Sequence, residues 1–161
     1  MKIFVFSDSH ADSSRMVKVI SKYNSQINAI IHLGDHDSDI ERIMHVAGNI
    51  PIAAVAGNCD MLSTRRNEVL AEYEDKKFLL IHGQNLVSAG NYGGALKAAK
   101  DNKADAVLFG HTHIPFCRTV NGILLFNPGS ISLPRGGSTY SFGIIEITDN
   151  KINAKCVDFE E

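Results

Sequence analysis

The sequence contains few cysteines and lacks an apolar run long enough to cross a membrane. Its three cysteines, Cys59, Cys117 and Cys156, are an odd number and lie far apart, so neither a disulfide framework nor a CxxC zinc site is indicated. No segment approaches the roughly 20 apolar residues that a membrane-spanning helix needs. A β-like strand begins within two residues of Met1, where a signal peptide would place a charged region and then an apolar one. We therefore expect a cytoplasmic protein with reduced thiols, no signal peptide and no membrane partner.

A basic stripe is also missing. The formal net charge at pH 7 is −2, and a solvated surface explains the short cationic pair Arg65-Arg66. Proteins that hold a nucleic-acid backbone usually gather many Lys and Arg side chains on one face. The sequence therefore argues against a polymeric nucleic acid as partner. It leaves a small phosphate-containing molecule open, because metal ions can supply the positive charge that the side chains lack.

The composition is that of an ordinary globular protein. Apolar residues make up 44% of the 161 residues and charged residues 21%. A chain of this length can bury a substantial core, and no internal repeat, low-complexity segment or linker divides it. We expect a single domain over residues 1–161.

Short apolar strands alternate with helical patterns along the chain, which predicts an α/β fold. Strands are expected at 3–6, 29–33, 52–56, 68–73, 77–81, 106–109, 123–126, 141–147 and 152–157, with a hairpin turn at 74–76. One helix is expected around Met16, Val17, Val19 and Ile20 with Ser13 or Ser14 as N-cap, a second with Ile40, Ile43, Met44 and Ala47 on its buried face, and a third over 95–100. The second helix should end at Gly48-Asn49.

Polar clusters follow five of these strands at their carboxyl ends. They are Asp8-Ser-His10, Gly34-Asp35, Gly57-Asn58, His82-Gly83 and Gly110-His111-Thr-His113. In open α/β sheets, ligands bind outside the carboxyl ends of the strands. We therefore expect these five ends to converge on one site.

The side chains in these clusters suit metal ions. Asp8 and His10, like His111 and His113, are two residues apart, a spacing that puts both side chains on the same side of an extended backbone. Four His, two Asp and one Asn are too many ligands for one tetrahedral ion but suit two ions that share a carboxylate. Two ions about 3.5–4 Å apart are a known arrangement for in-line attack on phosphorus.

Plainer explanations exist for each residue alone. A single Asp or His at a strand end is usually a turn residue or a helix cap, but five such clusters, each after a buried strand, are hard to ascribe to turns. His32 is expected to be a core or interface residue, His45 to lie on a helix surface, and His36 to be at most a neighbour of a ligand. Gly57 and Gly110 are expected to allow close backbone approach or a positive φ.

The ordered clusters, together with Cys59-Asp60, resemble the motif set of the calcineurin-like metallophosphoesterases. Asn127-Pro-Gly-Ser130 followed by Pro134-Arg135 resembles the C-terminal signature of their small bacterial and archaeal branch, the YfcE-like phosphodiesterases. The resemblance covers essentially the whole chain. It implies a four-layer α/β/β/α sandwich, in which two mixed β-sheets pack together and helices flank them.

The resemblance also implies a role for each site residue. Asp8, His10 and His113 would hold the first metal, Asp35 would bridge, and Asn58, His82 and His111 would complete the second. A metal-bridging hydroxide would attack a small phosphodiester in line, with Asp35, Asn58, His111 and Asp60 as the catalytic set and Asn58 and Arg135 as phosphate contacts. The cofactors implied are two divalent ions, Mn first, with Zn, Fe or Ni as alternatives.

The sequence departs from the family pattern at three places. Cys59 stands where many members have a His, and a neutral thiol is a poor acid for an alkoxide leaving group. Ser38 stands where an Asp is common, with Asp39 displaced by one position, and Gln84 replaces a frequent His. The first departure favours diesters with good leaving groups over phosphomonoesters.

Two other functions stay open. One is a phosphomonoesterase, including a protein phosphatase. The other is a non-catalytic scaffold like the retromer subunit of this fold, although all seven metal ligands are present. Segments 84–93 and 131–139 are expected to form the loops that set specificity. Exposed β segments leave a homo-oligomer open.

Overall fold

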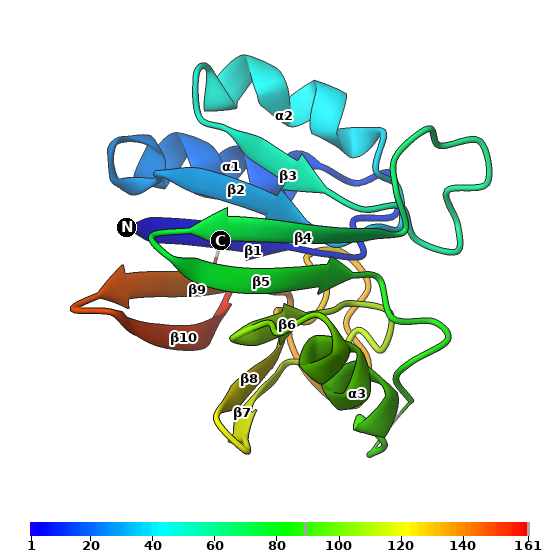
Figure 1. Cartoon of the computed structure of the whole chain (residues 1–161). Helices are drawn as coiled ribbons and strands as arrows, with labels where there is room; N and C mark the ends of the chain where they lie inside the picture. Colours follow the sequence, from blue (N-terminus) through cyan, green and yellow to red (C-terminus); the bar gives the residue numbers. More distant parts are fainter. Residues whose placement is uncertain (89, 161) are drawn as a thin grey trace.

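The computed structural model describes residues 1–88 and 90–160, and in that part of the chain the strands form two five-stranded sheets (Figure 1). The first sheet has the order β10-β9-β1-β2-β3, with β1 at Lys2–Phe6, β2 at Ala29–His32, β3 at Ile52–Ala54, β9 at Ser141–Thr148 and β10 at Lys151–Asp158. The second has the order β4-β5-β6-β8-β7, with β4 at Glu68–Tyr73, β5 at Lys76–Ile81, β6 at Ala106–Leu108, β7 at Phe116–Val120 and β8 at Ile123–Asn127.

Helices cover the outer face of each sheet. The helices α1 (Ser14–Tyr23) and α2 (Asp39–Ala47) lie against the first sheet, and α3 (Gly93–Asp101) lies against the second (Figure 1). A short 3-10 turn, Asn24–Gln26, follows α1. None of the described helices has the length and apolarity needed to span a bilayer. The four-layer sandwich of two mixed sheets flanked by helices is confirmed.

Alternating side chains along each strand build the layers. In β1, Ile3 and Val5 point into the core between the sheets, whereas Phe4 and Phe6 pack under the helices. In β5, Leu80 faces the other sheet and Leu79 faces α3. Because neighbouring residues on a strand point to opposite faces, a strand that is apolar throughout must be covered on both sides. The apolar runs of the sequence thus require the four layers.

Parallel pairing brings the polar strand ends to one edge. β1, β2 and β3 are parallel to one another in the first sheet, and β5, β6 and β8 are parallel in the second. The arrowheads of β2, β3 and β5 point to the same end of the molecule (Figure 1). The polar clusters that follow these strands therefore meet where the two sheets end side by side.

Several expectations about individual elements were wrong. Met44 is 55% exposed because the buried face of α2 uses Ile40, Ile43 and Ala47, with Val46 beside them. Ser13 is the N-cap of α1, as expected, but its side chain makes no capping hydrogen bond, and Asp12 accepts from the backbone and hydroxyl of Ser14 instead. The third strand ends at Ala54 instead of Ala56, α3 begins inside the expected 84–93 loop, and β7 was not anticipated.

Candidate metal centre

Backbone strain is concentrated at the polar strand ends. Five of the seven expected ligands have a positive φ: Asp8 (54°), His10 (45°), Asp35 (59°), His111 (65°) and His113 (59°). Residues with side chains rarely adopt this conformation, which costs of order 1–3 kcal/mol each and persists where surrounding contacts enforce it. The five residues therefore lie just beyond regular strand geometry, held by the structure around them.

Asp60 provides much of that support. Its Oδ2 accepts hydrogen bonds from the backbone N–H groups of Asp35 (2.9 Å) and Gly57 (2.7 Å), and its Oδ1 accepts from His36 (2.8 Å) and Asp37 (3.1 Å). One carboxylate thus ties the turn after β2 to the turn after β3. Asp60, expected in the catalytic set, therefore fixes the backbone that carries Asp35.

The Asn127 and Ser130 side chains support the other half of the site. Nδ2 of Asn127 donates to the carbonyl of Gly110 at 2.7 Å, which fixes the turn that carries the two histidines after β6. The hydroxyl of Ser130 donates to the carbonyl of Asp8 at 2.8 Å. In the sequence both residues belong to the motif Asn127-Pro-Gly-Ser130, and the structure shows that each holds a turn that carries expected ligands.

The sequence analysis did not predict a buried series of hydrogen bonds that involves His32, Ser9 and Asp39. The N–H of Gly34 donates to Nδ1 of His32 (3.2 Å), so the other ring nitrogen carries the proton and donates to Oγ of Ser9 (3.1 Å). Ser9 in turn donates to Oδ2 of Asp39 (2.7 Å). His32 is fully buried, as expected, and this chain ties the loop after β1 to the start of α2. The sequence feature that could have revealed this chain is Ser9, a polar residue between the expected ligands Asp8 and His10.

Two glycines permit the close approach. A Cβ on Gly57 would lie 2.3 Å from Oδ1 of Asp35, and a Cβ on Gly110 would lie 1.9 Å from Oγ of Ser7 and 2.7 Å from Oδ2 of Asp8. Contacts this short are excluded, so any side chain at these positions would displace an expected ligand. The close-approach explanation is confirmed for both glycines, neither of which has a positive φ.

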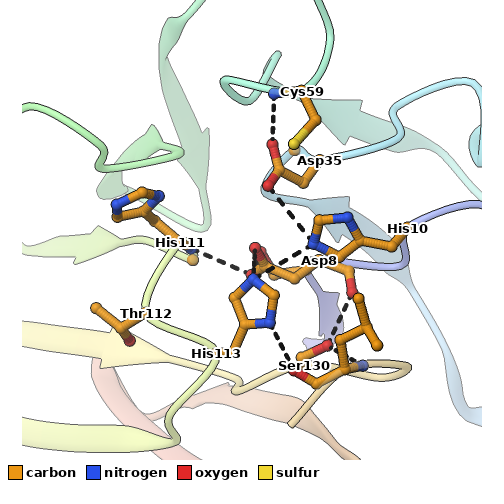
Figure 2. Close-up of polar contacts among 12 residues, drawn as sticks. Asp8, His10, Asp35, Cys59, His111, Thr112, His113 and Ser130 are labelled. Carbon is orange, nitrogen blue, oxygen red and sulfur yellow. Dashed lines mark hydrogen bonds and ion pairs between the residues drawn. The ribbon is translucent and has the colours of Figure 1, made fainter. Parts of the chain in front are cut away.

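The first group of ligands is compact. Asp8, His10, Asp35 and His113 each offer a ligand atom, and these atoms lie within 4.8 Å of one another. Nε2 of His113 lies 3.1 Å from Oδ1 of Asp8 and 3.3 Å from Nε2 of His10, which is itself 3.6 Å from Oδ2 of Asp35. Figure 2 shows the four side chains pointing toward a common centre. Three of the four residues are buried.

The second group lies on the other side of Asp35. Oδ1 of Asp35 lies 3.4 Å from Nε2 of His82. The amide oxygen of Asn58 lies 3.1 Å from both Nε2 of His82 and Nδ1 of His111. The two carboxylate oxygens of Asp35 therefore face different histidines, as a bridging ligand requires.

The tautomers of two histidines favour metal binding. Nδ1 of His82 lies 2.8 Å from the carbonyl of Leu33, and Nδ1 of His113 lies 2.5 Å from the carbonyl of Leu133. A carbonyl can only accept, so each Nδ1 carries a proton, and in the neutral form of each ring the lone pair is on Nε2. Both Nε2 atoms face carboxylate oxygens in the centre. Such carbonyl contacts commonly orient metal-binding histidines.

The charges also suit a cation. Burial alone would raise the pKa of Asp8, but the contact with His113, the nearby His82 and the Ser7 hydroxyl outweigh it, so the pKa falls below its ordinary value. Burial lowers the pKa of His10 and of His111, which keeps both rings neutral. These protonation states, an ionised carboxylate and neutral imidazoles, are those that metal ligands need.

His113 titrates in the opposite direction. Burial would lower its pKa, but the contact with Asp8 outweighs it and raises the pKa above the ordinary value. Oδ1 of Asp8 is buried and accepts no hydrogen bond of good geometry from the described residues, although Nε2 of His113 is 3.1 Å away. A cation between these two atoms would satisfy both, so the residues present fit a metal ion.

The remaining candidates lie around this centre. The ring of His36 is 5.8 Å from that of His10, centroid to centroid. Cys59 is exposed, and its N–H donates to Oδ1 of Asp35 at 2.9 Å. Partial desolvation of its thiol and the nearby carboxylates raise the pKa of this thiol to about 11. Arg135 is exposed, and its N–H donates to the carbonyl of His113 at 3.3 Å. His45 is exposed on α2, as expected.

Two stacked mixed sheets with Asp, Asn and His gathered beyond their parallel strand ends define a metallophosphoesterase. The sequence profile of the calcineurin-like phosphoesterase superfamily domain matches residues 1–150. The chain therefore belongs to the calcineurin-like phosphoesterase superfamily.

Individual proteins agree with this assignment. The chain is 33% identical to the probable metallophosphoesterase MJ0623 of Methanocaldococcus jannaschii, over 100% of this chain and 83% of that protein. It is 31% identical to the phosphodiesterase YfcE of Escherichia coli over 110 residues, which cover 66% of this chain and 57% of YfcE. A crystal structure of a predicted phosphoesterase from Streptococcus pneumoniae superposes with a TM-score of 0.81 at 28% identity, covering 98% of this chain and 88% of the other.

The same fold also occurs in Vps29. The zinc complex of Vps29 from Entamoeba histolytica superposes with a TM-score of 0.76 at 19% identity, covering 99% of this chain and 100% of that one. At this identity the likeness concerns the fold alone.

Proposed function

We propose that this chain is a phosphodiesterase that hydrolyses small phosphodiesters with two divalent ions, Mn²⁺ first among the candidates. The observation that carries the proposal is the position of Asp35, whose two carboxylate oxygens lie 3.6 Å and 3.4 Å from the Nε2 atoms of His10 and His82. Imidazole, carboxylate and amide donors together suit Mn, Zn, Fe and Ni more than Mg or Ca. The name of the relative YfcE, a phosphodiesterase, supports the reaction class.

Each side chain has a proposed task at this centre. Asp8, His10 and His113 would hold one ion and Asn58, His82 and His111 the other, with Asp35 shared between them. When bound, the ions supply Lewis acidity and lower the pKa of water toward neutrality, which hydrolysis at pH 7 requires. Asn58 and Arg135 are both exposed at the rim, where they are available to phosphate oxygens. Asp60 holds the turn of Asp35 in place and so positions the shared ligand.

The two alternatives make different demands on the site. A phosphomonoesterase must expel poorer leaving groups, and Cys59 at the position after Asn58 offers only a thiol as acid. A protein-binding scaffold would not need all seven ligands, nor strained backbone at five of them. Both observations favour the diesterase. We also propose a cytoplasmic location, in keeping with three free cysteines.

The proposal is tested by activity after metal exchange. The protein is stripped with a chelator and reloaded with Mn²⁺, and hydrolysis of bis(p-nitrophenyl) phosphate is compared with that of p-nitrophenyl phosphate. We expect metal-dependent cleavage of the diester, lost in Asp35→Ala and retained in the control Asp75→Ala in the exposed β4–β5 turn. A preference for the monoester would point to the phosphomonoesterase. No turnover with any of Mn, Zn, Fe or Ni would favour the scaffold.

A further inference from the structure

A cavity of about 720 Å³ opens beside the candidate metal centre. His36, Cys59 and Asp60, which are neighbours of expected ligands in the sequence or the fold, line it together with Met61, Leu62 and Arg65. Cys59 and Asp60 also bond to the turn that carries Asp35. The cavity therefore adjoins the turns that hold Asp35 and Asn58, and its volume falls within the ~300–1,000 Å³ typical of small-ligand sites.

Most of the cavity lining belongs to a well-anchored loop, residues 58–65. The N–H of Asp60 donates to the carbonyl of Gly57 at 3.2 Å, and the N–H of Ser63 donates to the carbonyl of Asp60 at 3.0 Å. The hydroxyl of Ser63 donates to Oδ2 of Asp37, and Nη1 of Arg65 pairs with the same oxygen at 3.2 Å. The base of this loop is thus fixed from both sides.

At the tip of this anchored loop two apolar side chains face solvent. Met61 is 91% exposed and Leu62 is 98% exposed, more than any other large apolar residue among those described. Single exposed apolar residues are common on protein surfaces, but two adjacent ones on a fixed loop beside a reaction centre indicate a contact surface. Both side chains line the same cavity as His36 and Cys59, beside the metal centre.

The charges around the cavity determine which chemical group of a bound molecule can enter it. The guanidinium of Arg65 forms an ion pair with Asp37 through Nη1, and both oxygens of Asp60 accept backbone N–H groups. Glu41 adds a further negative charge to the lining. A second phosphate in this cavity would meet acidic groups and no unpaired Lys or Arg among the described lining residues. An uncharged group faces no such repulsion.

We propose that this cavity receives an uncharged, apolar ester group of the phosphodiester, with Met61 and Leu62 as its specificity-determining contacts. The inference rests on the proposed function and narrows it: substrates are diesters with at least one neutral apolar substituent, such as an aryl group, rather than polyphosphates or oligonucleotides. Burying such a group against two long apolar side chains supplies binding free energy in proportion to the area removed from water.

Two substrates with the same leaving group test the cavity. The Mn²⁺-loaded double variant Met61→Gln/Leu62→Asn is compared with wild type on phenyl p-nitrophenyl phosphate and methyl p-nitrophenyl phosphate. We expect KM for the phenyl ester to rise about tenfold with little change in kcat. An unchanged KM for the methyl ester would show that the cavity holds the group retained in the product; an equal rise for both would show that it holds the leaving group. KM values that stay within twofold for both esters would overturn the proposal.

A matched control and a binding measurement complete the design. Met44→Gln makes the same chemical change at a residue of α2 that is 55% exposed and outside the cavity, and should leave both KM values unchanged. Calorimetric titration of the Mn²⁺-loaded protein with phenylphosphonate and methylphosphonate should show tighter binding of the phenyl compound to wild type and loss of that difference in the double variant.

The failures of the two proposals are distinguishable. If wild type hydrolyses neither ester, the proposed function fails, whereas the phosphonate titration still reports on the cavity. If the double variant alters the oligomeric state in size-exclusion chromatography while phosphonate binding is unchanged, the loop 58–65 forms a protein interface and the substrate proposal is wrong.

Discussion

Asp60 illustrates how one side chain can fix the backbone around an expected metal ligand, Asp35, and around the turn that precedes Asn58. Its carboxylate accepts four backbone N–H groups from two turns, those of Asp35, His36, Asp37 and Gly57. Asp60→Asn replaces one acceptor oxygen with an NH₂ group that must face backbone donors. Because hydrogen bonds to a charged group contribute about 1.5–3 kcal/mol, we expect the free energy of unfolding to fall by about 2–3 kcal/mol.

The same variant should lose activity, because the backbone of Asp35 is no longer fixed. We expect kcat for bis(p-nitrophenyl) phosphate to fall at least about tenfold, as displacement of a ligand by a fraction of an ångström is costly in catalysis. Urea denaturation and steady-state kinetics check the two effects. Asp75→Asn removes the same charge in the exposed β4–β5 turn and should alter neither quantity. Normal kcat in Asp60→Asn would contradict the positioning role.

Gly110 gives a second prediction at the scale of one residue. In Gly110→Ala, the new Cβ would overlap Oγ of Ser7, which donates to Oδ2 of Asp8 at 2.6 Å. Both side chains are buried, so the strain cannot be relieved into solvent. We expect a loss of about 1–3 kcal/mol in stability and weaker Mn²⁺ binding in calorimetry.

Gly93→Ala is the matched control for that substitution. Gly93 is exposed at the start of α3, and its nearest neighbour to an added Cβ is Oδ1 of Asn91 at 3.4 Å. Alanine should be neutral there or stabilise by up to about 1 kcal/mol, because it restricts the unfolded chain and favours the helix. Unchanged metal affinity in Gly110→Ala would show that Asp8 is less constrained than its contacts indicate.

For single residues, the sequence predicted which side chains gather at the site better than it predicted their backbone conformation. The spacing of Asp8 and His10 was taken to place both side chains on one side of an extended strand, yet both residues have a positive φ beyond the end of β1. They come together because the backbone turns. Residue types at strand ends can be recognised from the sequence, whereas left-handed conformations depend on tertiary hydrogen bonds, such as that of Ser130 to Asp8, which no local pattern encodes.

The strands β4 and β5 test the double-sided burial of the sheets. Leu80 in β5 is fully buried between the two sheets, whereas Leu70 in the edge strand β4 is 46% exposed. Leu80→Ala should lower the free energy of unfolding by about 2–5 kcal/mol, because it removes contacts and leaves a cavity. Leu70→Ala, the same chemical change, should cost less than about 1 kcal/mol. Similar losses in urea denaturation of both variants would contradict the core described here.

The elements differed in how well the sequence predicted them. The fully buried strands are apolar throughout and were found, with boundaries that shifted by a few residues. The strand β7, Phe116–Val120, was missed because its three central residues are exposed and it lies at a sheet edge. Its only sheet partner is β8 among the described strands, so its sequence carries no burial pattern. Edge strands of this kind are specified by their partner rather than by their own residues.

The order of the strands in each sheet could not be predicted from the sequence. β9 and β10 come last in the chain, yet β9 pairs with β1 and β10 pairs with β9, so the final segment completes the first sheet. Alternation of strands and helices predicts α/β layers, but it does not say which edge a returning strand joins. The two-sheet arrangement came from the family resemblance, and the single domain over 1–161 stays a prediction.

Metal binding should stabilise the whole molecule, because the centre joins turns from both sheets. A ligand at about 100 times its Kd stabilises the folded state by about 2.7 kcal/mol, and each kcal/mol raises the Tm of a protein of this size by about 2–4 °C. We therefore expect Mn²⁺ to raise the Tm of the chelator-stripped protein by about 5–10 °C in calorimetry. Titration should reveal two equivalents of Mn²⁺ per chain, as the two groups of ligands on either side of Asp35 require.

The variant Asp35→Ala distinguishes two models: one in which Asp35 binds both ions, and one in which two independent sites bind one ion each. If Asp35 bridges, its loss weakens both ions at once, and the variant should bind fewer than two equivalents and gain less than half of the wild-type Tm increase. Asp75→Ala, in the exposed turn, should behave like wild type. If Asp35→Ala still bound two equivalents with wild-type affinity, the two histidine groups would hold their ions separately. The sheets would then meet at this edge without being joined through a common carboxylate.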